Sequence, residues 1–328
     1  MMNVGLIGVG SISRVHIKAY EKIEEAKIVA CCDIRPETME QFEDARKYTD
    51  IDLFLEKEAG KLDYVDICLP TYLHKEVAVK AMKLGYDVLC EKPMARSTEE
   101  ANEMIKVSNE TKKRLMIAHC SRFIGAVKMM KECIESGELG KPLNAEFYRE
   151  GGSKEPMGYN NWFRDESLSG GAILDLHIHD VDMMRGLFGM PEAVSVVGAN
   201  IIEGAGYDSV AATYIYPDMF VSAKCDWTIK GDMFNTRTIR VNYEKGYMFV
   251  DRTQDRTIFV KVDETGEKQD LTDKIDADMY YNEILYYIDC LKNNKPFDYC
   301  PVSESAQAVK IVEKERESAN LRGEKIKL

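Results

Sequence analysis

An apolar run near the N-terminus passes directly into a glycine-containing turn, and this junction constrains the fold more than any other feature. Residues 3–7 form the run, and a turn containing Gly8 and Gly10 follows at once. Apolar residues then recur at helical spacing, and a second apolar run, residues 27–32, ends at Asp33. This order of strand, glycine turn, helix and strand predicts a parallel Rossmann sheet that binds a dinucleotide.

Each small residue of the turn has an expected role toward the dinucleotide. Gly8 is expected to allow the tight turn, and Gly10 to let the backbone approach the pyrophosphate. The helix that begins near Ser11 and Ile12 would offer its free N–H groups to this anion. Ser13 stands at the third glycine position of the fingerprint, where a small residue packs the helix against the strand.

Asp33 also bears on which dinucleotide is bound. Its carboxylate stands where it would accept hydrogen bonds from the adenosine ribose hydroxyls, and its charge would repel a 2′-phosphate. Arg35, two residues further on, could instead pair with such a phosphate. We therefore predict NAD as the cofactor, with NADP as the alternative.

The alternation of strands and helices continues through the first third of the chain. Apolar runs at residues 64–69, 86–90 and 114–119 predict three more strands, with helical periodicity between them. We expect an α/β Rossmann domain over residues 1–122 and a second domain over residues 123–328, since one core rarely serves a chain this long.

Polar residues follow two of these strands, where ligands of an open parallel sheet bind. Pro70, Thr71 and His74 follow the third strand, and Glu91 and Lys92 follow the fourth. All five are candidates for cofactor binding. A solvated surface lysine and a histidine at the start of a helix are the alternative interpretations of Lys92 and His74.

The second half of the chain has a different pattern. Short alternating or apolar runs predict strands at residues 144–149, 195–197, 210–215, 220–227, 236–241, 247–250 and 257–262. Helical spacing marks residues 280–291 and 303–320, and we expect the charged residues 313–317 to form a solvated face. The pattern predicts an α+β domain with a large, mostly antiparallel, open sheet.

One stretch of this second domain has the composition of a catalytic helix. After Gly170 and Gly171, the polar residues Asp175, His179 and Asp182 recur at helical spacing among apolar residues. A single helix would place the three on one face. A carboxylate one turn from a histidine can orient and tune a general base. The alternative is a buried histidine that is simply hydrogen-bonded.

His177 and His179 also form a His-x-His pair, which binds metal when it lies in a strand. On a helix the two imidazoles diverge by about 200°. The helical spacing of the neighbouring residues therefore argues against a metal, and we predict none.

An aromatic loop precedes this stretch. Residues 151–168 contain Trp162 among aromatic and amide side chains, and such a group suits a polyol or sugar ring. The alternative is a loop that Trp162 anchors to its own domain.

Charge and cysteine content limit the partners. The formal net charge of −12 disfavours nucleic acid and anionic membranes. No apolar run approaches the roughly 20 residues that span a bilayer, and the N-terminus does not have the pattern of a signal peptide. Nine cysteines without a Cys-x-x-Cys pair indicate reduced thiols in a cytoplasmic protein.

Four motifs together resemble the Gfo/Idh/MocA oxidoreductases, in the same order along the chain. They are Gly8-Val9-Gly10, Pro70-Thr71-Tyr72-Leu73-His74, Glu91-Lys92-Pro93 and Asp175-Leu176-His177-Ile178-His179-Asp180-Val181-Asp182. The resemblance implies that Lys92, Asp175 and His179 form the catalytic group. We expect these three residues, together with Arg122 and Trp162, to contact the substrate. It also implies a homo-oligomer, a dimer or tetramer, built on the open sheet. His177 departs from the family, in which glycine is common at this position.

The resemblance implies an NAD(P)-dependent oxidoreductase that moves a hydride between nicotinamide and a carbinol carbon. A sugar, sugar derivative or inositol is the expected small-molecule substrate. Two alternatives remain open. One is an NAD-dependent glycoside hydrolase that oxidises its substrate transiently and eliminates the substituent. The other is a sensor that binds dinucleotide without chemistry, which the presence of Lys92, Asp175 and His179 disfavours.

Overall fold

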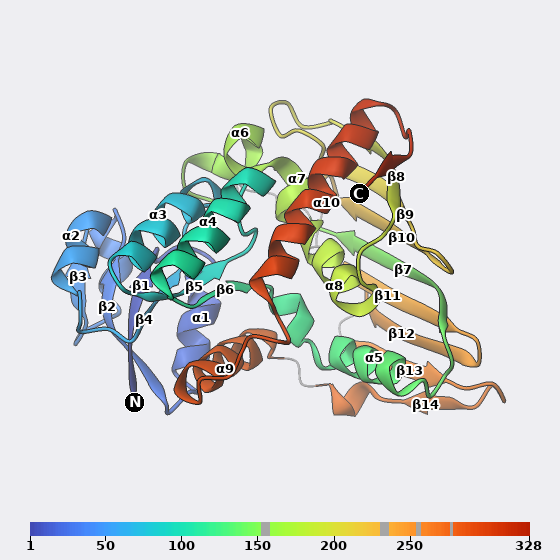
Figure 1. Ribbon diagram of the computed structural model, residues 1–328, viewed down its shortest axis with the longest axis horizontal. Coiled ribbons are helices and arrows are strands. Elements are labelled where there is room, and N and C mark those ends of the chain that lie inside the picture. Colours follow the sequence, from blue (N-terminus) through green and yellow to red (C-terminus); the bar gives the residue numbers. More distant parts are fainter. Residues whose placement is uncertain (152–157, 230–235, 254–256, 276–277) are drawn as a thin grey trace. The chain divides into compact units, whose positions relative to one another are not determined.

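The computed structural model divides the chain into two compact units (Figure 1). It describes all residues except 152–157, 230–235, 254–256 and 276–277. The first unit comprises Met1–Cys120 and Tyr280–Val309, and the second comprises Ser121–Met279 and Lys310–Leu328. The chain first passes from one unit to the other between Cys120 and Ser121, close to the expected boundary at residue 122. The return of the chain to the first unit at Tyr280 was not predicted.

Aromatic packing explains this return. Helix α9 (Met279–Lys292) carries Tyr287, whose ring lies edge-on to that of Tyr64 with 5.0 Å between centroids. Phe297 stacks on Tyr287 at 5.4 Å, and Arg114 Nη1 donates a hydrogen bond to Cys290 O at 2.6 Å. Tyr287 and Tyr64 are fully buried. Two buried aromatic rings therefore join α9 to β4, although Tyr64 and Tyr287 are 223 positions apart in the sequence.

The first unit contains a six-stranded sheet in which every neighbouring pair is parallel. Its strands are β1 (Met2–Ile7), β2 (Ala26–Cys32), β3 (Arg46–Tyr48), β4 (Tyr64–Ile67), β5 (Asp87–Glu91) and β6 (Leu115–Ala118). The order β3-β2-β1-β4-β5-β6 is that of a Rossmann sheet, as predicted. The short strand β3 and the helix after it were not predicted.

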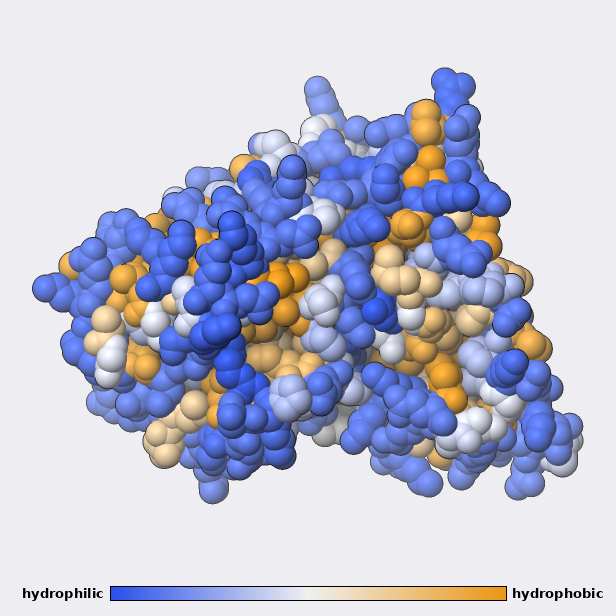
Figure 2. Space-filling view, in the orientation of Figure 1, coloured by the Kyte–Doolittle hydropathy of each residue, from blue (hydrophilic) through white to orange (hydrophobic). Residues whose placement is uncertain are grey.

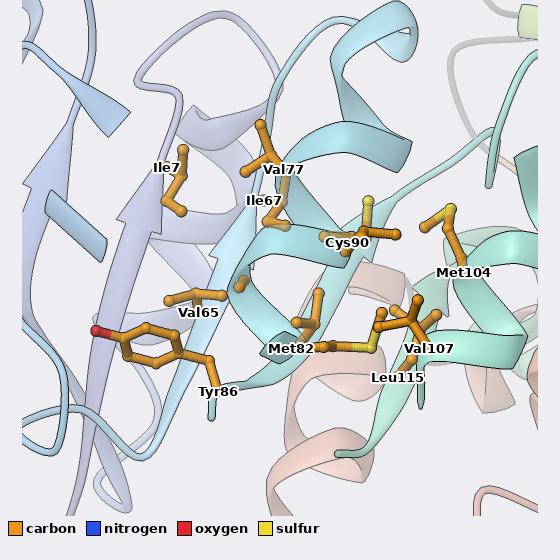
Figure 3. Packing of buried hydrophobic residues seen from close by; sticks show 14 of the residues in the cluster. Ile7, Val65, Ile67, Val77, Met82, Tyr86, Cys90, Met104, Val107 and Leu115 are labelled. Carbon is orange, nitrogen blue, oxygen red and sulfur yellow. The ribbon is translucent and has the colours of Figure 1, made fainter. Parts of the chain in front are cut away.

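Helices α2 (Ile51–Lys57), α3 (Thr71–Lys83) and α4 (Thr98–Thr111) pack on one face of this sheet, together with the first part of α10 (Val302–Asn320). Figure 3 shows Val77 and Met82 of α3 and Met104 of α4 against the apolar strand residues. Each side chain of this size contributes about 1.5–3 kcal/mol when it is fully buried. The outer surfaces of α3 and α4 are mainly hydrophilic in Figure 2, as expected of amphipathic helices.

Helices α1 (Ser13–Tyr20) and α9 pack on the opposite face. The Tyr64 hydroxyl, on this side of β4, donates a hydrogen bond to Tyr20 Oη of α1 at 3.0 Å. Ser13 is fully buried, and its hydroxyl donates to Gly10 O at 2.8 Å. Serine therefore serves at the third glycine position without preventing close packing of α1.

The second unit is built on a nine-stranded sheet. Its strands are β7 (Pro142–Glu150), β8 (Ala193–Ala199), β9 (Ser209–Ile215), β10 (Phe220–Asp226), β11 (Thr236–Tyr243), β12 (Gly246–Arg252), β13 (Ile258–Val262), β14 (Lys268–Asp270) and β15 (Ile326–Lys327). The order is β14-β13-β12-β11-β7-β10-β9-β8-β15, and only the β7–β10 pair is parallel. The predicted, mostly antiparallel sheet is confirmed, although β14 and β15 were not predicted.

One face of this sheet is covered by helices and the other is open. Along β7, Ala145 and Phe147 are buried whereas Glu146 and Tyr148 are not. Such alternation is typical of an antiparallel sheet with one solvated face. Figure 1 shows the covering helices on one side of the strands. They are α5 (Gly125–Ser136), α7 (Gly171–Asp175), α8 (Ile178–Phe188) and the part of α10 (Val302–Asn320) that belongs to this unit.

The expected single helix through Asp175 and His179 is wrong: the segment forms two helices, α7 and α8. Ala172 O accepts hydrogen bonds from the N–H groups of both Leu176 and His177, at 3.0 and 2.9 Å. The second bond spans one residue more than an α-helical bond, so the turn is widened and the phase of the following residues changes. Face assignments from a regular 3.6-residue period therefore do not carry across this junction.

The expected solvated face at residues 313–317 is wrong at its centre. Glu315 is fully buried, and its Oε1 accepts a hydrogen bond from the Tyr214 hydroxyl of β9 at 2.6 Å. Among the helices in the described part of the chain, none has the length and apolar content needed to cross a bilayer. All nine cysteines are buried thiols.

Candidate functional site

The conformation of the glycine turn requires Gly8 and leaves space at Gly10. Gly8 has φ +91°, and a Cβ there would lie 2.5 Å from Cys68 O, so only glycine fits. A Cβ at Gly10 would meet nothing closer than Arg35 Nη2 at 3.9 Å. The backbone at Gly10 therefore borders open space, and Ser11 and Ile12 carry the chain from it into α1.

Asp33 is tied to this turn directly. Its Oδ2 accepts a hydrogen bond from the Val9 N–H at 2.8 Å. Its Oδ1 accepts from the backbone N–H of Arg35 at 2.9 Å and from Arg35 Nε at 3.1 Å. Asp33 is 8% exposed. The two residues predicted to select the dinucleotide therefore form an ion pair beside the glycine turn.

The other predicted cofactor residues follow strands of the same sheet. Pro70 and Thr71 begin α3 after β4, and Glu91 ends β5 directly before Lys92. Because the strands are parallel and adjacent in the order β2-β1-β4-β5, these residues line up along one edge of the sheet.

The Glu91-Lys92-Pro93 segment is held by its neighbours. Glu91 Oε2 accepts a hydrogen bond from the Lys92 N–H at 3.0 Å, and the Lys92–Pro93 peptide bond is cis. His74 is buried, with its ring nitrogens 2.7 Å from Pro93 O and 2.8 Å from Leu69 O. His74 thus connects the loop after β4 with the loop after β5, which favours a positioning role for this residue.

In the second unit, Asp175 ends α7 and His179 lies in the first turn of α8. Asp175 is 8% exposed, and His179 is half-buried. His179 Nδ1 lies 3.3 Å from the hydroxyl oxygen of Ser121, which is itself buried. Ser121 is a partner of the predicted base that the sequence analysis did not find. Its only local signal is its position next to the predicted end of the first domain.

Asp182 and Arg122 form a buried ion pair. Arg122 Nε donates to Asp182 Oδ2 at 2.6 Å, and Arg122 Nη2 donates to Oδ1 at 2.7 Å. Both side chains are at most 4% exposed. This bidentate geometry favours a structural role for Arg122 over its predicted contact with substrate.

His177 lies in a buried network, apart from the Ser121 contact of His179. Its Nε2 is 2.9 Å from the Tyr214 hydroxyl oxygen, which links it to Glu315. Burial lowers the pKa of His177, but the charges of Glu315 and Asp180 raise it more, so the pKa is above its ordinary value. Asp180 in turn binds Arg149 through both carboxylate oxygens.

Trp162 is half-buried within η3 (Tyr159–Arg164) and stacks on Phe163, with 3.9 Å between ring centroids. Phe163 lies edge-on to Trp227 at 6.3 Å. The loop is thus anchored to its own unit through Phe163. Residues 152–157 of the same predicted loop lie outside the described residues.

Within the described residues, one group brings three candidate metal ligands within 4.8 Å of one another: His16, Asp66 and Cys68. All three are buried, and both ring nitrogens of His16 lie at hydrogen-bonding distance from carboxylate oxygens. Burial raises the pKa of the Cys68 thiol, which opposes the thiolate that a metal requires.

Comparisons with known proteins agree with this geometry. Residues 2–119 match the family model described as an oxidoreductase family with an NAD-binding Rossmann fold, and residues 127–249 match the GFO/IDH/MocA C-terminal domain. The 2,7-anhydro-N-acetylneuraminate hydratase of Escherichia coli is 29% identical over 82% of this chain and 75% of its own length. The myo-inositol 2-dehydrogenase of Thermotoga maritima is 26% identical over 90% of each chain.

A solved structure also has the same fold. The WlbA dehydrogenase of Bordetella pertussis, in complex with NADH and UDP-GlcNAcA, superposes with a TM-score of 0.85 over 100% of this chain and 97% of its own. Its sequence identity is 22%, so this likeness concerns the fold alone. Because the two family models together match most of the sequence, the chain belongs to the Gfo/Idh/MocA family of NAD-binding oxidoreductases.

Proposed function

We propose that the protein is an NAD-dependent dehydrogenase acting on a CH–OH group of a sugar, sugar derivative or inositol. One observation carries this proposal: Asp33, the glycine turn, Pro70 and Lys92 follow β2, β1, β4 and β5, which are consecutive along the edge of the sheet. A dinucleotide bound in the Rossmann manner runs along this edge. Its adenosine end would lie toward Asp33, and its reactive end toward Lys92.

The chain's own groups fit the cofactor that this proposal requires. Gly8, Gly10, Ser11 and Ile12 would hold the pyrophosphate through backbone N–H groups, because no side chain fills the space at Gly10. Asp33 and Arg35 would contact the adenosine ribose. Pro70, Thr71 and His74 after β4, Glu91 at the end of β5, and Lys92 are the remaining predicted cofactor contacts. When bound, NAD supplies the acceptor for the hydride that leaves the substrate carbon.

The proton chemistry is assigned to Lys92, Asp175 and His179. In oxidation His179 would take the hydroxyl proton as general base, and Asp175 would orient the imidazole. Lys92 would donate a hydrogen bond to the same substrate oxygen and stabilise the developing alkoxide charge. The contact between Ser121 and His179 Nδ1 supports this assignment, since a partner at one ring nitrogen sets the tautomer at the other.

The names of relatives support the substrate class. A myo-inositol 2-dehydrogenase, a glucose-6-phosphate 3-dehydrogenase and a levoglucosan dehydrogenase all align with this chain at 26–31% identity. Each name describes oxidation of a ring hydroxyl. The stacked Trp162 and Phe163 present aromatic surface of the kind that sugar rings contact.

A second candidate is redox-assisted elimination or hydration without net cofactor turnover. The observation that favours it is the similarity to a hydratase over 82% of this chain, since hydration involves no net oxidation. Transient oxidation by a bound NAD would need the same proton transfers at His179 and Lys92.

One experiment separates these candidates. Polyols, sugars, anhydro sugars and aryl glycosides are offered with NAD or NADP, while nicotinamide reduction and product release are followed together. Reduction of NAD in proportion to product supports the dehydrogenase. Product formation with catalytic NAD and no accumulated NADH supports the second candidate. Binding of dinucleotide with no reaction across the panel would contradict both.

We further propose a cytoplasmic homo-oligomer, a dimer or tetramer. The nine buried thiols fit a reducing compartment: burial raises the pKa of Cys31 to about 11 and that of Cys32 to about 12, which suppresses their reactivity. On the open face of the second sheet, a hollow of about 450 Å³ is lined by residues that include Tyr148, Val197 and Lys224. Val197 is 56% exposed there, as expected of a face that packs against another copy.

A further inference from the structure

A buried polar network lies beneath the Glu91-Lys92 segment, entirely within the first unit. His16, in α1, is fully buried. Its Nδ1 is 2.8 Å from Asp66 Oδ2 of β4, and its Nε2 is 2.9 Å from Glu91 Oε1 at the end of β5. Groups from α1, β4 and β5 therefore meet at one imidazole.

The contacts continue on both sides of His16. On one side, Asp66 Oδ2 also accepts a hydrogen bond from the Tyr20 hydroxyl at 2.9 Å, and Tyr20 accepts one from Tyr64 at 3.0 Å. On the other side, Glu91 uses its second oxygen, Oε2, to accept the Lys92 N–H at 3.0 Å. The chain of contacts thus runs from the Tyr64 hydroxyl of β4 to the backbone N–H of Lys92.

The protonation state of His16 follows from its two partners. A neutral imidazole has one N–H, so it can donate to only one of the two carboxylates, whereas the imidazolium donates to both. Burial lowers the pKa of His16, but the charge of Asp66 and the hydrogen bond to it raise the pKa well above its ordinary value. The Tyr280 ring of α9, with its centroid 6.0 Å from that of His16, helps to keep water away.

We propose that His16 is a positioning residue: its imidazolium fixes the Glu91 carboxylate, and Glu91 fixes the Lys92 backbone from which the catalytic side chain projects. The helix that receives the dinucleotide pyrophosphate is thereby joined to the lysine that acts on the substrate. The inference rests on the proposed function for the role of Lys92. It goes beyond that function by assigning to His16 and Glu91 a positioning role that requires no contact with the substrate.

Two substitutions at His16 separate its two contacts. In His16→Gln the side-chain amide reaches the position of Nε2, so it retains a donor toward Glu91 and loses the one toward Asp66. In His16→Asn the shorter amide reaches the position of Nδ1, so it retains the donor toward Asp66 and loses the one toward Glu91. Both variants remove the same buried charge, so their losses of thermal stability should be similar.

The first readout is independent of activity. Hydrogen exchange of the Lys92 amide is measured by NMR in the protein without cofactor. We expect exchange in His16→Asn to be at least tenfold faster than in the wild type, because Glu91 is no longer held against the amide. In His16→Gln the protection should remain within about threefold of the wild type.

The second readout is turnover at saturating dinucleotide, alongside the dissociation constant for NADH. We expect kcat to fall roughly 10- to 100-fold in His16→Asn, the usual consequence of a misplaced catalytic group, and much less in His16→Gln. NADH affinity should change little in either variant. Equal losses of kcat and equal amide exchange in the two variants would overturn the proposal and leave His16 with a structural role only.

Glu91→Gln provides a second route if the His16 variants do not fold. It keeps the size of the side chain and removes the charge that His16 holds, so Lys92 amide exchange should accelerate as in His16→Asn. Unchanged exchange would contradict the proposal. If instead the wild type and Lys92→Ala have the same activity, the proposed function fails, whereas the exchange measurements still decide whether His16 positions Lys92.

Discussion

The Arg35 guanidinium lies against the Asp33 carboxylate, with Nε 3.1 Å from Oδ1 and Nη2 3.3 Å from Oδ2. Asp33 simultaneously accepts the Val9 N–H of the glycine turn. A negative charge that would disfavour a 2′-phosphate and a positive charge that would bind one thus form an ion pair. Removal of the carboxylate would release the guanidinium.

Replacement of Asp33 by serine should therefore shift the cofactor preference toward NADP. The expected change in the NADP to NAD ratio of kcat/KM is about tenfold or more, which corresponds to about 1.4 kcal/mol. Asp33→Asn is the matched control, because it keeps an oxygen for the Val9 N–H while losing the charge. In the double variant Asp33→Ser/Arg35→Ala the gain should disappear. An unchanged ratio in Asp33→Ser would show that Asp33 does not face the ribose.

Lys92→Ala should lower turnover far more than it weakens dinucleotide binding. A hydrogen-bond donor to the reacting oxygen is worth roughly 10²–10³-fold in kcat. Turnover at saturating NAD and NADH affinity by fluorescence titration are the two measurements. Lys83→Ala, at the exposed end of α3, serves as control and should leave both unchanged. Should NADH affinity collapse while saturated turnover persists, Lys92 is a binding residue.

His179→Ala should cost roughly two to four orders of magnitude in turnover, because it removes the proposed general base. Oxidation needs the imidazole neutral, so the wild-type rate should fall at acidic pH, and the variant should lack this limb. The fully buried His177 is the matched control: His177→Ala should reduce thermal stability and affect turnover much less. Near-normal turnover in His179→Ala together with a lower melting temperature would identify His179 as a core histidine.

Ser121→Ala tests the contact with His179 Nδ1. The loss of one hydrogen bond is worth about 0.5–1.5 kcal/mol, so kcat should fall about 2- to 10-fold. The effect should vanish when Ser121→Ala is introduced into His179→Ala, because the two residues act through one interaction. Additive losses in the double variant would mean that Ser121 acts independently of His179.

His177 should make stability depend on pH. Its pKa in the folded protein is above the unfolded value of about 6.5, chiefly because the Glu315 charge overcomes the effect of burial. The stabilisation is therefore fully present below about pH 6.5 and is lost as pH rises through the folded pKa. The free energy of unfolding of the wild type and of His177→Gln is measured with urea from pH 6 to pH 9. The excess of the wild-type value over that of the variant should shrink as pH rises. A difference that is constant or that grows with pH would contradict this assignment.

Local pattern was sufficient for most of the elements. Apolar runs, helical spacing and the glycine turn predicted five strands of the parallel sheet. These features depend on backbone conformation and on burial of one face over a few residues. Both can be inferred from the residue types within a short stretch of sequence. The short strands β3, β14 and β15 carry too few residues to show a period.

The sequence by itself therefore determined the parallel Rossmann sheet and the mostly antiparallel character of the second sheet. Only the tertiary structure decided which polar groups meet. His16 is 50 positions from Asp66 and 75 from Glu91, and Tyr214 is 101 positions from Glu315. A buried charge is stable where folding brings a partner to it, and the same residue without that partner would lie in solvent. Glu315 is buried within a charged run for this reason, since its environment depends on Tyr214 and His177 rather than on its sequence neighbours.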